Sequence, residues 1–269
     1  MSGLVRYVDN IAPNQASGGL GDAVPPGGTP NTMGSWVELL SASDNQWGGD
    51  VVVLTVESIG LDLTDSSMLM DLSLFDGSTD HIVVDRLAIG YINRPRSMIL
   101  PISIPSGVAI RARCQCATTS RLAHIGLHLV GGTGFDGRPM WSGSKIVALS
   151  AFTGSRGVAH LCGINAYSSW ADLVPSVGRD YCGFIVAIQG AGDTSLSNRQ
   201  RFWWQIGIGA APALTVAHLT CVTDGSETIF AQTGKYFPIP LPSGTQVRVR
   251  GAAMSGLNRT LDVSLYGVR

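Results

Sequence analysis

The feature that most constrains this chain is an internal repeat. Residues Pro101–Arg113 read PISIPSGVAIRAR and residues Pro238–Arg250 read PIPLPSGTQVRVR, so that seven of thirteen positions are identical. A second pair of segments, SWVELL at Ser35–Leu40 and SWADLV at Ser169–Val174, recurs at nearly the same spacing. Repeats must be recognised first, because they decide how every other segment is assigned. Each copy is about as long as a domain, so we expect two similar folded modules rather than a solenoid.

Both copies show the alternation that is typical of half-buried strands. In VAIRARCQC (108–116), small or apolar residues alternate with Arg111, Arg113 and Gln115. Turn sequences such as Asp76-Gly77 and Pro105-Ser106-Gly107 separate such segments, and no long segment has a helical stripe. Many short strands with Gly/Pro turns predict an all-β chain of two tandem antiparallel β-sandwich, jelly-roll-like domains.

The repeat also sets the expected domain boundaries. We expect an extended Gly/Pro-rich N-terminal arm at 1–33, a first sandwich at 34–130, a Gly-rich linker with a leading strand at 131–166, and a second sandwich at 167–269. The arm has few apolar anchors and would be disordered alone, so we expect it to lie on a neighbouring subunit.

The composition favours a protein that assembles. Charged residues make up 14% of the chain, against about 25% in a typical soluble domain, and the net formal charge is −1. We interpret this as a surface covered by copies of the chain, the alternative being a domain that is simply rich in Gly and Ala. The lack of a basic excess argues against nucleic-acid binding, and no apolar run reaches the ~18 residues of a membrane span. The N-terminus has no secretory pattern, so we expect synthesis in the cytoplasm.

Motifs for chemistry are weak. Gly132, Gly134 and Gly137 match the dinucleotide fingerprint, but no helix pattern follows, which indicates a glycine linker. His124 and His128 are predicted on the outward face of a strand, about 13 Å apart, too far to share a metal ion. The sequence carries no nucleophile elbow, zinc-protease or phosphate-loop motif. We therefore expect no enzymatic activity, no cofactor and no metal.

Four arginines are the main candidate assembly residues: Arg111, Arg113, Arg248 and Arg250. They recur on the outer face of equivalent strands. One interpretation is a solvated strand face paired with nearby acids, and the other is contacts between modules or subunits, where arginine is enriched.

Three further residues complete the candidate assembly set. Trp141, in the predicted linker, is a candidate exposed anchor. The five cysteines are expected to be mainly buried reduced thiols. If any pair joins two subunits, Cys162 and Cys182 are the candidates, because the first copy has no equivalent of either.

The repeated unit, S-W-x-[ED]-L followed by P-I-x-[IL]-P-S-G-x-x-[IV]-R-x-R and a closing strand, resembles repeats in virion proteins of tailed bacteriophages. The resemblance covers roughly 34–130 and 167–269 and is most specific at the P-S-G turn. It implies β-sandwich or jelly-roll modules in a neck, collar, tail or capsid-surface protein.

The sequence thus predicts a structural component of a tailed-phage virion, made in the host cytoplasm. It would form a symmetric homo-oligomer on the neck, collar or particle surface and contact other virion proteins. The alternative is a receptor- or glycan-binding module of a tail fibre, which would need exposed aromatic and polar loops.

Overall fold

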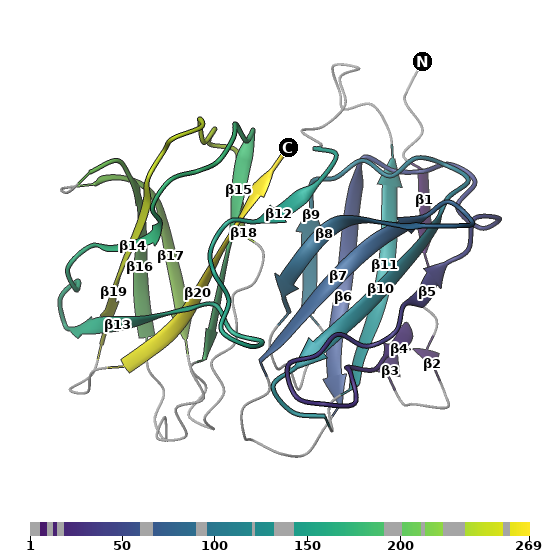
Figure 1. Ribbon diagram of the computed structural model, residues 1–269, viewed down its shortest axis with the longest axis horizontal. Coiled ribbons are helices and arrows are strands. Elements are labelled where there is room, and N and C mark those ends of the chain that lie inside the picture. The colour runs from purple at the N-terminus through teal and green to yellow at the C-terminus, as the bar shows by residue number, and fades with distance from the viewer. Residues whose placement is uncertain are drawn as a thin grey trace.

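A computed structural model of the chain shows two β-sandwiches side by side (Figure 1). It describes residues 6–9, 13–14, 19–59, 67–89, 96–119, 122–131, 143–190, 201–210, 213–222, 235–254 and 259–269. These residues form strands, turns and loops with no helix, which confirms the predicted all-β class. Accordingly, no helix in the described ranges is long and apolar enough to cross a membrane.

The strands of the first sandwich and of the N-terminal segment are β1 (Arg6–Asp9), β2 (Pro13–Asn14), β3 (Gly19–Leu20), β4 (Asp22–Val24), β5 (Val37–Leu40), β6 (Val51–Ile59), β7 (Met68–Phe75), β8 (Asp80–Ala88), β9 (Arg96–Leu100), β10 (Ala109–Cys116) and β11 (Leu122–Gly131). Those of the second are β12 (Ile146–Ala148), β13 (Val158–Ile164), β14 (Ala171–Val174), β15 (Gly183–Gly190), β16 (Arg201–Ile208), β17 (Leu214–Val222), β18 (Lys235–Phe237), β19 (Val247–Ala253) and β20 (Arg259–Val268).

Each sandwich has the strand order of a jelly roll. In the first, one sheet runs β4-β11-β6-β9 and the other β5-β10-β7-β8. In the second, the corresponding orders are β13-β20-β15-β18 and β14-β19-β16-β17. The two orders match strand for strand along the chain, which extends the sequence repeat to the whole topology.

Alternating side chains build a core in each sandwich. In β10, Ala112 and Cys114 are buried while Arg111 and Arg113 stay partly exposed. Two clusters of buried apolar side chains result, one in each sandwich. The first cluster also takes in Tyr266 and other residues of the second sandwich, so the two cores meet at the junction.

The N-terminal segment and the segment between the repeats supply equivalent strands. β1 and β4 both pair with β11, and β12 and β13 both pair with β20, in each case antiparallel. The described strands of the predicted arm therefore pair with their own chain. They lie on the open edge of β11, and the expectation that the arm also contacts a neighbouring subunit stays a prediction.

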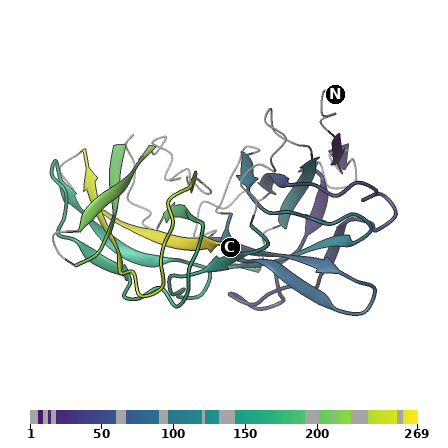
Figure 2. The ribbon, with the colours of Figure 1, turned by 90° about the horizontal axis from the view of Figure 1, so that it is seen from above.

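Among the described strands, β12 is the one that pairs with both sandwiches. β12 pairs antiparallel with β20 and parallel with β8, at Ile146 opposite Val84. The sheet formed by β5, β10, β7 and β8 thus continues into the second sandwich, and in the described residues it has 13 strands. Seen from above, the blue strands of the first sandwich and the yellow β20 meet at the centre of the molecule, where the chain ends (Figure 2).

Candidate assembly interface

The strand that reaches across to the first sandwich, β12, is itself held at its start by main-chain bonds. The N–H of Lys145 donates to the carbonyl oxygen of Arg269 at 2.9 Å, and the N–H of Arg269 donates to the carbonyl oxygen of Lys145 at 3.0 Å. The last residue of the chain is therefore fixed against the start of β12. Such pairing satisfies backbone groups that burial would otherwise leave unbonded.

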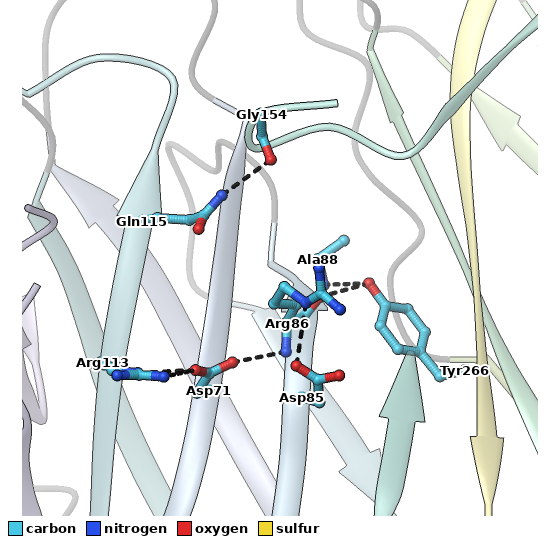
Figure 3. A network of polar contacts seen from close by, with 8 residues as sticks. All are labelled: Asp71, Asp85, Arg86, Ala88, Arg113, Gln115, Gly154 and Tyr266. Atoms are coloured by element: carbon cyan, nitrogen blue, oxygen red, sulfur yellow. Dashed lines mark hydrogen bonds and ion pairs between the residues drawn. The ribbon is translucent and has the colours of Figure 1, made fainter. Parts of the chain in front are cut away.

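A buried tyrosine clamps the second sandwich onto the first. The Tyr266 hydroxyl, on β20, donates to the carbonyl oxygen of Arg86 at 2.9 Å and accepts from the N–H of Ala88 at 2.7 Å (Figure 3). Both partners are main-chain groups of β8. Tyr266 is fully buried, and this burial raises the pKa of its hydroxyl well above the ordinary value, so the group stays protonated and able to donate.

The clamp lies at an irregularity in β8. Arg86 has φ of 47°, a left-handed conformation that is uncommon for a residue other than glycine. The pairing of β7 with β8 shifts register here, as at a β-bulge. The N–H of Arg86 donates to Asp71 Oδ1 at 2.8 Å, and the Arg86 guanidinium lies over the Phe152 ring, 5.0 Å from its centre. The bulge thus places Arg86, which has a strained backbone conformation, in contact both with Asp71 of the first sandwich and with Phe152, which precedes β13 of the second.

Asp71 connects this bulge to a predicted assembly arginine. Its carboxylate, 2% exposed, accepts hydrogen bonds at Oδ2 from Arg113 Nε and Nη2, both at 2.8 Å (Figure 3). One buried carboxylate is therefore shared by β10 and by the bulge of β8. A buried carboxylate needs such partners, because its desolvation is costly.

A second group of polar contacts crosses the same junction. Gln115 Nε2 donates to the carbonyl oxygen of Gly154 at 3.0 Å, and the N–H of Ser155 donates to Asn31 Oδ1 at 2.8 Å. On the other side, Gln189 Nε2 donates to the carbonyl oxygen of Met68 at 3.3 Å. The junction is thus bonded at three separate places, and its geometry is that of a fixed interface rather than a flexible linker.

The four predicted arginines make contacts within their own sandwiches. Arg111 lies 3.5 Å from Asp80 and stacks on Phe75, and Arg113 stacks on Trp36 with 4.5 Å to the ring centre.

In the second copy the same arrangement returns. Arg248 binds Asp172 at 2.7 Å, and Arg250 stacks on Trp170 at 4.4 Å to the ring centre while donating to Gln205 Oε1 at 2.7 Å. The arginine-on-tryptophan stack is therefore a repeated structural feature. Of the four arginines, Arg113 reaches the module junction, through Asp71.

The two candidate cysteines lie in different environments. Cys162 is buried in the second core, and burial raises the pKa of its thiol to about 12. A disulfide from Cys162 to another subunit would require the sandwich to open, because the sulfur is buried. Cys182 is exposed, and its Sγ donates to the carbonyl oxygen of Val268 at 3.1 Å.

Other expected positions can be placed as well. His124 is buried, which corrects its predicted position on an exposed face; in the sheet it lies opposite Ala23 of β4. Across the ranges that the structure describes, no group of three or more His, Cys, Asp or Glu side chains could hold a metal ion. Trp141 and the glycines at 132, 134 and 137 lie outside the described residues.

Sequence reasoning missed the junction. Neither the β8 bulge nor the role of β12 leaves a clear pattern in the chain. One signal was present: in the closing strand TLDVSLYG (260–267), Tyr266 stands on the face opposite Leu261, Val263 and Leu265. A large aromatic residue on the outer face of a strand indicates that something else covers that face.

Comparison with known proteins adds several likenesses of fold. No family model matches the chain, and no curated protein matches its sequence. Among solved structures, the chain is similar to the STIV MCP, with 13% identity, a TM-score of 0.42, and coverage of 97% of this chain and 96% of that one. It is also similar to the cowpea mosaic virus top component, with 8% identity, a TM-score of 0.32, and coverage of 91% and 92%. For the Gx strain of infectious bursal disease virus, identity is 13%, the TM-score 0.26, and coverage 99% and 71%. The strand order, not these likenesses, carries the assignment of the fold.

Proposed function

We propose that this chain is a structural subunit of a virus particle and that it assembles as a symmetric homo-oligomer. The observation that carries the proposal is the fusion of two jelly rolls of the same topology through β12. The bonded junction makes one block with two similar modules. Such a block suits a protein whose work is to present surfaces to neighbours, because repeated modules offer repeated contacts.

The exposed apolar side chains agree with this role. Leu161 and Ile164 on β13 are 55% and 41% exposed, and the nearby Met254 is 54% exposed. On the far edge of the second sandwich, Leu214 of β17 is 69% exposed. Because only 14% of its residues are charged, the chain has few charged side chains to keep these apolar surfaces soluble.

We further propose a place for the subunit on the neck, collar or surface of a tailed bacteriophage. The support is the resemblance of both repeats, above all the Pro105-Ser106-Gly107 and Pro242-Ser243-Gly244 turns. The subunit is made in the host cytoplasm and contacts other copies of itself and other virion proteins. Neither a cofactor nor catalysis has a part in this role.

The direct test is to measure the chain in purified particles. Quantitative mass spectrometry of particles banded in a density gradient should find it at a fixed ratio to the main shell protein. Its absence from the particles would contradict the structural role. Specific retention of the purified chain on host-cell glycans would instead favour the receptor-binding alternative.

Cys182 gives a separate test of the predicted cross-link. We propose that this exposed thiol lies at a contact between subunits. Light scattering with and without reductant should then show a reductant-sensitive species in the wild type that Cys182→Ser lacks. The matched variant Cys162→Ser should leave that species unchanged, because its sulfur is buried.

A further inference from the structure

The internal duplication repeats the two strand edges that pair at the junction, and the repeated pair lies at the ends of the sheets. Within the chain, β12 pairs with the outer edge of β8. By the matched strand orders, β1 is the equivalent of β12, and β17 is the equivalent of β8. Among the described residues, β1 and β17 are each the last strand of their sheet. The two strand types that join the modules are therefore both available again, in different modules (Figure 1).

β17 has the composition of a strand that is meant to be covered. Its sequence, LTVAHLTCV, is nine residues long and contains no Asp, Glu, Lys, Arg or Pro. Proteins usually protect an open strand edge with charges, proline or short length. The other terminal strand of this sheet, β5, is four residues long and carries Glu38, which is exposed. A long, uncharged edge such as β17 indicates a backbone partner.

We propose that β17 of one chain pairs in parallel with β1 of a second copy, as β8 pairs with β12 within the chain. The proposal rests on the homo-oligomer proposed above and names its contact. Because the two edges differ, the contact is heterologous, and each chain offers one edge of each kind. Repetition of such a contact closes into a ring when the rotation between copies allows it.

The register of the internal junction indicates which part of β17 is used. Leu69 pairs with Ala88 on β8, and the equivalent Trp203 pairs with Thr220 on β17. The N–H of Ala88 points out of its sheet edge toward Tyr266. By equivalence the N–H of Thr220 points outward as well, and the side chains of His218 and Thr220 are exposed. β17 has a register shift of its own between Thr215 and Ala217, but the described strand has no left-handed residue, and its pairing with β16 is continuous from Ala217 to Val222.

The experiment uses the full chain and two edge variants. Thr220→Pro removes the outward N–H of β17, and proline is tolerated at such an edge. Tyr7→Pro/Val8→Pro removes β1 from pairing, while β11 keeps its bonds to β4 and β6. A second β17 variant, His218→Lys/Thr220→Lys, keeps every N–H and adds charge instead. Ile99→Lys is the matched control, because it removes an exposed apolar side chain from β9, at the opposite end of the smaller sheet from β1. Circular dichroism and thermal melting check that each variant folds.

Light scattering then gives the mass of each protein, alone and in mixtures. The proposal predicts an oligomer for the wild type and Ile99→Lys, and the 28.2 kDa monomer for each edge variant. It also predicts that a β1 variant mixed with a β17 variant forms a one-to-one pair and nothing larger, since only one contact remains. Edge variants that stay at the wild-type mass would overturn this contact but leave the proposed function standing. A wild type that is monomeric at every concentration would overturn the proposed homo-oligomer and the contact together.

Discussion

Arg113 and Arg250 occupy equivalent positions in the two sandwiches, but they face different partners. Each guanidinium stacks on a tryptophan, Trp36 or Trp170. Arg113 also binds the buried carboxylate of Asp71, where Arg250 binds the neutral amide of Gln205. The duplication thus supplies a natural comparison between a charged and a neutral partner in the same geometry.

This difference predicts unequal costs of substitution. Arg113→Ala leaves the buried Asp71 carboxylate without its cation and should lower the free energy of unfolding by about 2–3 kcal/mol. Arg250→Ala leaves a neutral amide that water can reach, and should cost about 1 kcal/mol. Urea unfolding of both variants measures the difference. Equal losses would show that the stacking on tryptophan, and not the carboxylate, carries the contribution of Arg113.

His160 makes stability depend on pH. Burial lowers the pKa of this histidine to about 4, from about 6.5 in the unfolded chain. The unfolded state therefore binds a proton near pH 6.5 that the folded state rejects until about pH 4. The resulting loss of stability begins as pH falls through 6.5 and is complete below 4, at about 3 kcal/mol.

The measurement is the difference between wild type and His160→Gln in urea unfolding at pH 7.5 and pH 4.5. The variant should lose less stability than the wild type over this interval. Leu161→Gln provides the control, because this exposed neighbour of His160 does not titrate, and the variant should follow the wild type. An identical pH response in all three proteins would remove His160 as the source.

At the scale of the elements, the junction between the two sandwiches depends on β8 and β20. β8 departs from its equivalent β17 by a bulge at Arg86, and the Tyr266 hydroxyl occupies the two main-chain groups that flank it. The bulge and the tyrosine form one device. The tyrosine hydroxyl bonds two main-chain groups at the bulge, and these groups in turn satisfy the buried hydroxyl. This device gives the junction a fixed geometry.

Removing the hydroxyl tests the device. Tyr266→Phe leaves the N–H of Ala88 and the carbonyl of Arg86 buried without this partner, and should cost about 1–3 kcal/mol of unfolding free energy. Tyr167→Phe is the matched control, since Tyr167 is 37% exposed and lies under Arg250 at the surface. Hydrogen exchange should show faster exchange of the Ala88 amide in Tyr266→Phe. Unchanged exchange there would contradict the clamp.

The elements were predictable to the extent that they are local or repeated. Alternation in β10 and β20 and the P-S-G turns predicted the all-β class and two similar sandwiches. The edge partners were not predictable, because strands such as β1 and β12 are short and acquire their partners only through long-range pairing. His124 was misplaced for a related reason: period-two alternation assigns a face of the sheet, but it does not say what covers that face. Tyr266 and Asp71 act across distances in sequence that no local pattern records.

At the scale of the whole molecule, the two equivalent modules are joined by the pairing of β12 with β8. The equivalent strands, β1 and β17, each lie at the end of a sheet among the described residues. The 13-stranded sheet ends at β17, and the smaller sheet ends at β1. A monomer would leave both edges in water, with nothing in the composition of β17 to protect that edge. The central claim is therefore that the chain closes on copies of itself.

Electron microscopy of the purified wild-type protein, combined with its native mass, tests that claim most directly. The account predicts closed rings. Each chain contributes two lobes of similar size, so the number of lobes in a ring should be twice the number of chains calculated from the native mass. Separate two-lobed particles at the mass of one chain, or rings in which the lobes equal the chains in number, would contradict it.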